Sequence, residues 1–272
     1  MIQDIAPSRL DNSYKDLIPD DGDTVIVFDD KGKILADIRD SLISFSTAKD
    51  HDKGSLRYLF SIDDKRYFLA ETEGTEGKDN DNFFTIRQLR DSAAGVDLYA
   101  AFTAYHLWKW YHDNKYCPIC KEELVHDGKE RALRCEKCGN MIYPRINPAV
   151  IVGVTNGDSI LVTRYRQGYA HNALIAGFAE IGETLEETVA REVMEEAGIK
   201  VKNIRYYKSQ PWGMAQDLLV GFYCDADGDT TIKMDDNELR YAAWTKREDI
   251  VLQPNDLSLT NEMMKMFMQG KA

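Results

Sequence analysis

The sequence predicts an α+β protein whose second half is a mixed β-sheet covered by helices on both faces. Short apolar runs with strand character recur between residues 149 and 246. One long helical segment, residues 185–197, interrupts them, and an amphipathic segment at residues 257–268 follows them. Strands interleaved with one long helix and a terminal helix suit a sheet between two helical layers. Two Cys-x2-Cys pairs separate this half from a smaller N-terminal α+β region.

Six strands are expected in the second half, at residues 149–154, 159–164, 173–178, 204–208, 218–224 and 241–246. The Asn156-Gly157 turn joins the first two, as favoured in hairpins. Cys224 lies in an apolar run and is expected to be a buried strand residue. The methionine-rich segment 257–268 is expected to be a helix that packs on the core.

The first half alternates short strand-like runs with turns and then becomes helical. Residues 24–28 and 33–36 flank an Asp-Asp-Lys-Gly turn, and residues 56–62 and 66–70 flank Asp-Asp-Lys, so each pair is predicted to be a hairpin. Residues 71–82 are polar and glycine-rich and are predicted to be a loop. Apolar residues spaced by three and four predict a helix over residues 93–115. We interpret His51, His106 and His112 as surface or partly packed residues rather than metal ligands.

The whole chain has the composition of a folded protein with an acidic surface. It has 272 residues, is 43% hydrophobic and carries a net charge of −12. The apolar runs are too short to span a bilayer, and the N-terminus lacks a signal pattern, so a cytoplasmic protein is expected. The acidic charge argues against broad, charge-driven binding to nucleic acids. Five cysteines are not a disulfide framework in that compartment.

Four cysteines have the spacing of a metal site. Cys117 and Cys120 form one Cys-x2-Cys pair, Cys135 and Cys138 form the other, and fourteen residues separate the pairs. Four thiolates in a tetrahedron are the preferred ligands of structural Zn²⁺. Four protein ligands leave no open position, so the expected role is structural. The alternatives are two unrelated redox pairs or free thiols. The predicted domains are therefore an N-terminal α+β domain at 1–112, a zinc ribbon at 113–143 and a third domain at 144–272.

The helix at residues 185–197 carries several carboxylates on one face. Thr184-x-x-Glu187 is a capping-box start, and Gly198 is a natural stop. Glu192, Glu195 and Glu196 fall within about 100° of one another around the helix. Crowded carboxylates are tolerated mainly around a divalent cation, and oxygen ligands favour Mg²⁺ or Mn²⁺. The alternative is an ordinary solvated acidic face.

The full spacing G-x5-E-x7-R-E-V-x-E-E-x-G-I resembles the Nudix box, the motif of hydrolases that cleave a nucleoside diphosphate linked to another group. The matching residues are Gly177, Glu183, Arg191, Glu192, Val193, Glu195, Glu196, Gly198 and Ile199. The resemblance implies a Nudix α/β/α sandwich. It also implies that Glu192, Glu196, Glu238 and the Ala176 carbonyl bind Mg²⁺ or Mn²⁺. Glu195 would be a further ligand or a base, and Glu183 would orient Arg191.

Features outside the box are similar to the NADH pyrophosphatase branch of this superfamily. They are the cysteine ribbon, the preceding HLWKWYHDNKYCPIC, the linker YPRINPAVI and Ser209-Gln210-Pro211-Trp212. The branch splits the dinucleotide NAD(H) into nicotinamide mononucleotide and AMP, and some members remove an NAD cap from the 5′ end of RNA. It works as homodimers. Other open functions are hydrolysis of ADP-ribose or a dinucleoside polyphosphate, and nucleotide sensing without turnover.

The resemblance also implies substrate contacts. Tyr143 and Phe178 match rings that sandwich the nicotinamide, although without the resemblance both would be interpreted as core residues. The branch reads S-Q-P-W-P-F-P-x-S after the box, whereas this chain departs from it after the first four residues. Gly213 replaces a proline and is expected to loosen this loop. The remaining expected substrate residues are Gln210, Pro211, Trp212, Gly213, Met214, Ala215, Gln216, Asp217 and Thr260.

Overall fold

A computed structural model describes residues 1–70, 82–168 and 170–272. The chain forms two compact units. The C-terminal unit comprises Met1–Gln3, Ile146–Trp212 and Asp217–Ala272, and the N-terminal unit comprises Asp4–Arg145 and Gly213–Gln216. The three-domain division stays a prediction. In the described ranges, no helix is both long enough and apolar enough to cross a membrane.

The C-terminal unit is built on a six-stranded mixed sheet with the order β16-β17-β13-β14-β18, and β15 also pairs with β13. The central strand β13 runs parallel to β17 and antiparallel to β14 and β15. Two helices, α3 (Leu185–Ala197) and α4 (Leu259–Met268), complete the unit with the short 3-10 turn Arg247–Asp249. The strands are β13 (Asn147–Asn156), β14 (Ser159–Tyr165), β15 (Ile175–Phe178), β16 (Lys200–Trp212), β17 (Asp217–Asp227) and β18 (Leu239–Lys246).

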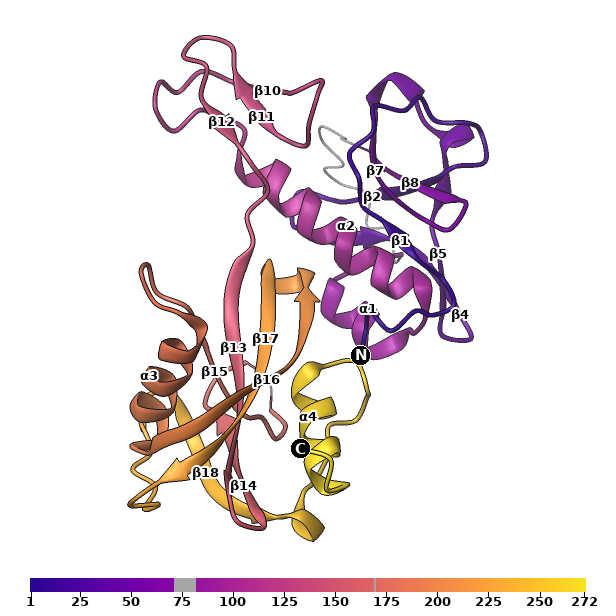
Figure 1. Ribbon diagram of the computed structural model, residues 1–272. Coiled ribbons are helices and arrows are strands. Elements are labelled where there is room, and N and C mark those ends of the chain that lie inside the picture. The colour runs from indigo at the N-terminus through magenta and orange to yellow at the C-terminus, as the bar shows by residue number, and fades with distance from the viewer. Residues whose placement is uncertain (71–81, 169) are drawn as a thin grey trace. The chain divides into compact units, whose positions relative to one another are not determined.

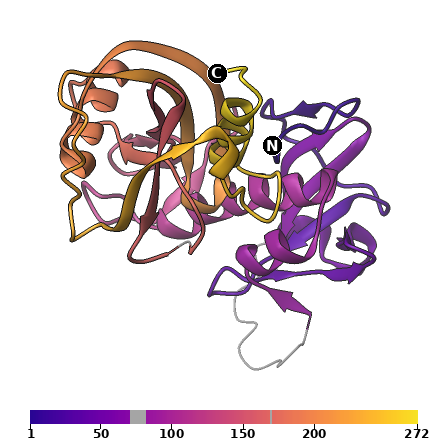
Figure 2. The ribbon, with the colours of Figure 1, turned by 90° about the horizontal axis from the view of Figure 1, so that it is seen from below.

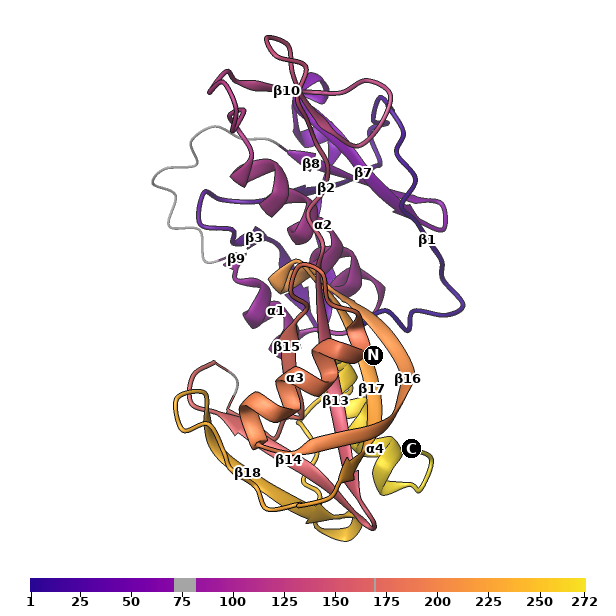
Figure 3. The same ribbon diagram turned by 60° about the vertical axis from the view of Figure 1, so that its left-hand side comes forward.

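The two faces of this sheet hold different cores because side chains alternate along a strand. Val150, Val152 and Val154 of β13 pack in one buried cluster with Val189 and Val193 of α3. The intervening Ile151 belongs to the opposite cluster, whose other members include the α4 residues Leu259, Met263, Met264 and Phe267. Helices α3 and α4 therefore cover opposite faces of the sheet (Figures 1 and 2). The predicted α/β/α arrangement is confirmed, and Figure 3 shows α3 in front of the strands.

The N-terminal unit contains a five-stranded sheet with the order β1-β7-β8-β2-β6. Its strands are β1 (Leu10–Asp11), β2 (Thr24–Val27), β6 (Ser46–Thr47), β7 (Leu56–Ile62) and β8 (Lys65–Ala70). Two further strand pairs join β3 (Ile34–Leu35) to β9 (Phe83–Phe84) and β4 (Asp37–Arg39) to β5 (Leu42–Ser44). The helices are α1 (Ile86–Ser92) and α2 (Val96–Asp113), with 3-10 turns at Ala48–Asp50, Lys53–Ser55 and Gly213–Ala215.

A three-stranded ribbon follows α2 in the same unit. Its strands are β10 (Leu124–His126), β11 (Leu133–Cys135) and β12 (Met141–Ile142). Trp110 of α2 is buried in one cluster with Leu124 and Leu133 of the ribbon. The helix therefore anchors the ribbon through its last turns.

The local predictions for the N-terminal unit are confirmed in part. The hairpin of β7 and β8 forms as predicted, and α2 lies within the predicted helical segment. The hairpin predicted for residues 24–36 forms only at its turn, where the Asp29 N–H donates to the Lys33 carbonyl at 3.0 Å. Strand β2 pairs in parallel with β8 and antiparallel with β6, and meets the β3 region through the isolated bridge Phe28–Ile34. The loop predicted for residues 71–82 lies outside the described residues except for Asn82.

Candidate active site and metal-binding cysteines

Helix α3 has the predicted boundaries because both of its ends are capped locally. The Thr184 side chain accepts a hydrogen bond from the Glu187 N–H at 3.2 Å. The Glu187 carboxylate accepts one from the Thr184 N–H at 2.8 Å, which completes a capping box. At the other end, Gly198 adopts a left-handed conformation with φ 69°. The caps fix which residues of α3 face the loop that precedes it.

Arg191 is the centre of the hydrogen-bond network on α3. Its Nε donates to Glu183 Oε1 at 2.6 Å and its Nη2 donates to Glu183 Oε2 at 2.9 Å, which is a bidentate pair. The same guanidinium donates to the Phe178 carbonyl at 2.9 Å. Arginine therefore ties the helix to both ends of the turn between β15 and α3. Hydrogen bonds from Arg191 lower the pKa of Glu183 to about 2.

Glu183 also closes this turn directly. Its carboxylate accepts hydrogen bonds from the Glu180 N–H at 3.1 Å and from the Thr188 hydroxyl at 3.0 Å. The sequence suggested that Glu183 orients Arg191, and the structure has the contacts that such a role needs.

Arg191 also contacts two of the three clustered carboxylates. Its Nη1 donates to Glu192 Oε1 at 2.7 Å and to Glu195 Oε2 at 3.0 Å. The positive charge of this arginine therefore relieves part of the repulsion between Glu192 and Glu195, and the expected divalent cation stays a prediction. In the part of the chain that is described, the box glutamates form no group whose ligand atoms all lie within 4.8 Å of one another.

Glycine at position 177 is required by a close approach. A Cβ built on Gly177 would lie 1.9 Å from Glu192 Cδ. Any side chain at this position would displace the Glu192 carboxylate. Burial raises the pKa of Glu192, against the effect of Arg191.

Glu196 is the buried carboxylate of the site, with 2% of its surface exposed. Burial, together with the charges of Glu238 and Glu192, raises its pKa to about 8. The Tyr165 hydroxyl lies 3.2 Å from both carboxylate oxygens of Glu196. It also accepts a hydrogen bond from the Ala176 N–H at 3.0 Å. Sequence reasoning missed Tyr165, because only the paired strands bring it to α3.

These residues fit a divalent cation. A buried carboxylate with a raised pKa next to two further carboxylates is stabilised by positive charge. Oxygen ligands of this kind suit Mg²⁺ or Mn²⁺. The residues that would hold the ion are Glu192, Glu196, Glu238 and the Ala176 carbonyl.

The four ribbon cysteines form a second candidate metal site. All four sulfur atoms lie within 4.8 Å of one another, with Sγ–Sγ distances of 3.6 Å for Cys117–Cys138 and 3.4 Å for Cys120–Cys135. A tetrahedron of thiolates around Zn²⁺ has edges of about 3.8 Å. Backbone N–H groups lower the pKa of Cys117 and Cys135, whereas neighbouring sulfurs and burial raise the pKa of Cys120 and Cys138. The cluster can therefore bind a structural metal.

Each cysteine pair is followed by a residue in the left-handed region. Lys121 has φ 63° and Gly139 has φ 75°. The Lys121 N–H donates to the Cys117 carbonyl, and the Gly139 N–H donates to the Cys135 carbonyl, both at 2.9 Å. The two halves of the site thus use the same turn. Glycine adopts this conformation without a steric cost, whereas lysine rarely does.

The two expected stacking rings are both partly exposed. Phe178 at the end of β15 exposes 53% of its surface, and Tyr143 in the N-terminal unit exposes 54%. The Tyr143 hydroxyl donates to Glu130 Oε1 at 2.9 Å. Neither ring is a core residue, which removes the alternative left open by the sequence.

Residues 209–212 are not a loop, because β16 continues through Trp212. Gln210 is fully buried, and its amide donates to Gln3 Oε1 and to the Leu257 carbonyl, both at 2.9 Å. Its side-chain oxygen accepts from the Leu259 N–H at 2.7 Å. The side chain of Gln210 therefore supports the start of α4. Its contact with a substrate stays a prediction.

The expectation that Gly213 loosens the chain is wrong. A Cβ at Gly213 would lie 2.1 Å from the Phe102 carbonyl oxygen, so glycine permits a close approach to α2. Gly213–Ala215 form a 3-10 turn, and Asp217 is buried at the start of β17. Thr260 lies in the first turn of α4. The contacts of Pro211, Trp212, Met214, Ala215, Gln216, Asp217 and Thr260 with a substrate stay predictions.

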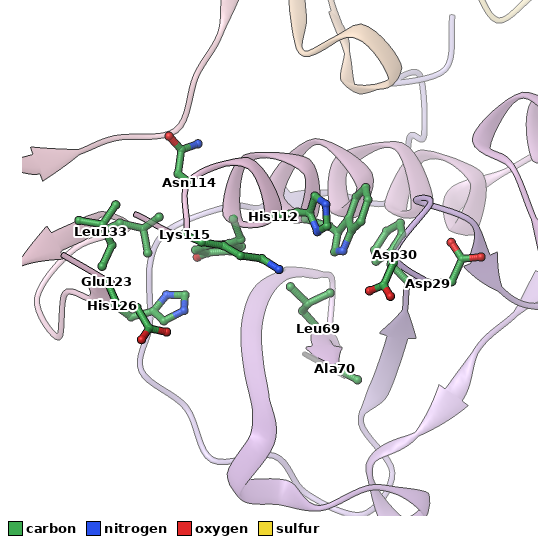
Figure 4. A pocket seen from close by; sticks show the side chains of 14 residues that line it. Asp29, Asp30, Leu69, Ala70, His112, Asn114, Lys115, Glu123, His126 and Leu133 are labelled. Atoms are coloured by element: carbon green, nitrogen blue, oxygen red, sulfur yellow. The ribbon is translucent and has the colours of Figure 1, made fainter. Parts of the chain in front are cut away.

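A cavity of about 280 Å³ lies in the N-terminal unit, away from the box residues in sequence. Its lining comes from the end of β2, the end of β8, the last turns of α2 and the ribbon. Figure 4 shows Lys115 extending into it, and Asp30 and Glu123 also line it. None of its lining residues belongs to the box or to the cysteine cluster. The candidate active site is therefore built from the box residues and not from this cavity.

Comparison with known proteins identifies the C-terminal unit. The NUDIX domain model matches residues 145–267. Over 174 residues, the chain is 43% identical to the NAD-capped RNA hydrolase NudC of Shigella dysenteriae serotype 1 (strain Sd197) and 42% identical to that of Escherichia coli (strain K12 / DH10B). The alignment covers 62% of this chain and 66% of each relative, so the chain spans just under two thirds of their length.

A solved structure shows the same fold. The crystal structure of a NUDIX hydrolase from Nitrosomonas europaea superposes with a TM-score of 0.51 at 20% identity, over 58% of this chain and 92% of that chain. Together with the box geometry on α3, these matches place residues 145–267 in a Nudix domain.

Proposed function

We propose that the protein is a metal-dependent hydrolase that cleaves the pyrophosphate of NAD(H) to nicotinamide mononucleotide and AMP, both in the free dinucleotide and at the 5′ end of NAD-capped RNA. The observation that carries this proposal is the intact box network around Arg191. It lies within the matched NUDIX domain, in a chain that is 43% identical over 174 residues to a protein named NAD-capped RNA hydrolase NudC.

The box residues and their neighbours have different roles in hydrolysis of the pyrophosphate. Glu192, Glu196, Glu238 and the Ala176 carbonyl would hold Mg²⁺ or Mn²⁺, and that ion would supply positive charge to the phosphates and lower the pKa of the attacking water. Glu195 exposes 59% of its side chain and can accept a proton from water at the surface of the site. Glu183 holds Arg191, and Arg191 holds the Phe178 carbonyl at the edge of the site.

Aromatic rings account for the preference for nicotinamide. Phe178 and Tyr143 each expose about half of their surface, so both have ring area available to stack on a flat heterocycle. In a homodimer, Tyr143 can come from either protomer. Residues 211–217 and Thr260 complete the proposed contacts.

A second, structural metal site, a cytoplasmic location and a homodimer complete the proposed enzyme. The four cysteines bind Zn²⁺ as a structural ion, because they offer four thiolates and no open position. We place the enzyme in the cytoplasm as a homodimer, with a dinucleotide or a capped RNA end as its partner and no DNA or membrane partner.

The test compares substrates at equal concentration with Mg²⁺ or Mn²⁺ present. The panel contains NAD⁺, NADH, NAD-capped RNA, ADP-ribose, FAD and diadenosine polyphosphates, with products identified by mass and Glu196→Gln as the inactive control. Nicotinamide mononucleotide from a free or capped NAD substrate, at a higher kcat/KM than any other product, supports the proposal. Preferred cleavage of ADP-ribose or a dinucleoside polyphosphate would replace the substrate assignment. Binding without turnover would indicate a nucleotide sensor instead.

A further inference from the structure

The hydroxyl of Tyr165, which belongs to no motif, contacts two of the residues that are expected to hold the metal. Its hydroxyl lies 3.2 Å from Glu196 Oε1 and 3.2 Å from Glu196 Oε2. It receives the Ala176 N–H at 3.0 Å and lies 3.4 Å from the Ala176 carbonyl oxygen. One hydroxyl thus joins a carboxylate of α3 to the strand residue whose carbonyl is an expected ligand.

The direction of these hydrogen bonds follows from the number of protons. A phenol has one proton to donate and oxygen lone pairs to accept. Because the Ala176 N–H already donates to the Tyr165 oxygen, the Tyr165 proton is free for an acceptor. The Glu196 carboxylate is the closest acceptor and is charged when ionised, and hydrogen bonds to a charged partner are the stronger ones.

The backbone holds the ring where it can do this. Tyr165 is the last residue of β14, and the pairing of β14 with β18 shifts register between Arg164 and Tyr165. After this shift the backbone pairing resumes at the next residue, where the Arg166 N–H donates to the Glu238 carbonyl at 2.9 Å. A register shift of this kind re-aims a side chain. The same irregularity therefore brings Tyr165 close in the chain to the contact with Glu238, which lies in the turn just before β18.

We propose that Tyr165 is a positioning residue of the metal site, whose hydroxyl fixes the Glu196 carboxylate toward the Ala176 carbonyl. The inference rests on the proposed function for the assignment of Glu196 as a metal ligand. Partners that orient a ligand carboxylate change metal affinity or activity by roughly 10- to 100-fold when removed. Tyr165 acts through Glu196 and makes no contact with the substrate in this assignment.

The test measures metal binding without substrate. Mn²⁺ is titrated into the full chain, and free Mn²⁺ is followed by electron paramagnetic resonance. Tyr165→Phe removes one oxygen and is expected to weaken Mn²⁺ binding roughly 10-fold or more. The KM for NAD⁺ at saturating metal is expected to stay within about threefold, because ligand orientation affects the metal step and not dinucleotide contacts.

Tyr223→Phe is the matched control. Tyr223 is a buried tyrosine of the C-terminal unit, whereas Tyr165 is partly buried, and the Tyr223 hydroxyl donates to the Met263 carbonyl at 2.7 Å in the core on the α4 side. The Tyr223→Phe substitution also removes a phenol oxygen, but at a position away from the box residues. Its Mn²⁺ affinity is therefore expected to stay within about twofold of that of the native protein. A general loss of packing would affect both variants alike.

A second replacement keeps the ring and restores a donor. p-Aminophenylalanine at position 165, introduced site-specifically, places an N–H where the hydroxyl was and is expected to restore Mn²⁺ affinity to within about threefold. This replacement decides the question even if Tyr165→Phe does not fold. The proposal is overturned if Tyr165→Phe folds and binds Mn²⁺ as the native protein does, or if the amine-bearing ring fails to rescue. If the variants change Mn²⁺ binding as expected but the native protein does not hydrolyse NAD, the proposed substrate is rejected and the role of Tyr165 is retained.

Discussion

Arg191 and Glu183 form a two-point pair, with Nε–Oε1 at 2.6 Å and Nη2–Oε2 at 2.9 Å. The pair spans the turn between β15 and α3, and Arg191 uses its remaining N–H groups on Glu192, Glu195 and the Phe178 carbonyl. One side chain therefore sets the positions of the helix carboxylates and of the turn at the edge of the site.

Arg191→Lys is expected to lower kcat by roughly 10- to 100-fold, the range found when a partner that orients metal ligands is removed. A lysine ammonium is a point charge and cannot replace a planar guanidinium that binds two oxygens at once. Steady-state kinetics measures the effect. Arg205→Lys is the control, because Arg205 lies on the edge strand β16 and pairs with Asp225 of β17. Equal rates for Arg191→Lys and the native protein would remove Arg191 from the site.

Glu196→Gln is expected to lower the maximal rate at least ~100-fold, because it removes the charge of the buried carboxylate but keeps its shape. The matched control is Glu186→Gln, an exposed glutamate in the first turn of the same helix. Its rate is expected to stay within about twofold of the native rate. Comparable turnover by both variants would refute the assigned role of Glu196.

Cys117→Ser is expected to abolish zinc binding and to lower the melting temperature of the N-terminal unit, because the site loses one of four thiolates. Elemental analysis and a thermal melt measure the two effects. Cys224→Ala serves as the control, since Cys224 is buried in the core cluster of the C-terminal unit and takes no part in the cysteine group. It is expected to retain zinc. A native protein without zinc, and a melt unchanged by chelators, would refute the ribbon as a zinc site.

Thr184→Ala is expected to lower the free energy of unfolding by about 1 kcal/mol, the typical cost of losing an N-cap side chain. Thr184→Ser keeps the hydroxyl that accepts from the Glu187 N–H and is expected to retain most of the stability. Urea unfolding followed by circular dichroism measures the difference. If serine and alanine destabilise equally, the capping hydrogen bond does not stabilise α3.

The features predicted well from the sequence are those whose causes are local. Helix α3 begins at Leu185 and ends at Ala197 because the residues that cap it, Thr184 and Gly198, directly flank it. The four cysteines likewise come from two short segments of the sequence, and their sulfur atoms lie within 4.8 Å of one another as expected.

The features predicted poorly depend on residues far apart in the chain. Strand β2 pairs with β8 rather than with its neighbour, because a sheet partner is chosen by packing and not by turn chemistry alone. Glycine is required at position 213 because a Cβ there would clash with the Phe102 carbonyl, over a hundred residues earlier in the chain. Tyr165 reaches Glu196 only through the assembled sheet, so no motif near either residue indicates the pair.

The most direct test of the central claim is the mass of the products formed from NAD⁺ with Mg²⁺ or Mn²⁺ in water enriched in oxygen-18. We expect nicotinamide mononucleotide and AMP in equal amounts, with one heavy oxygen in only one of them, because water attacks a single phosphorus of the pyrophosphate. Release of free nicotinamide with ADP-ribose, or recovery of intact NAD⁺ after prolonged incubation with either metal, would contradict the account.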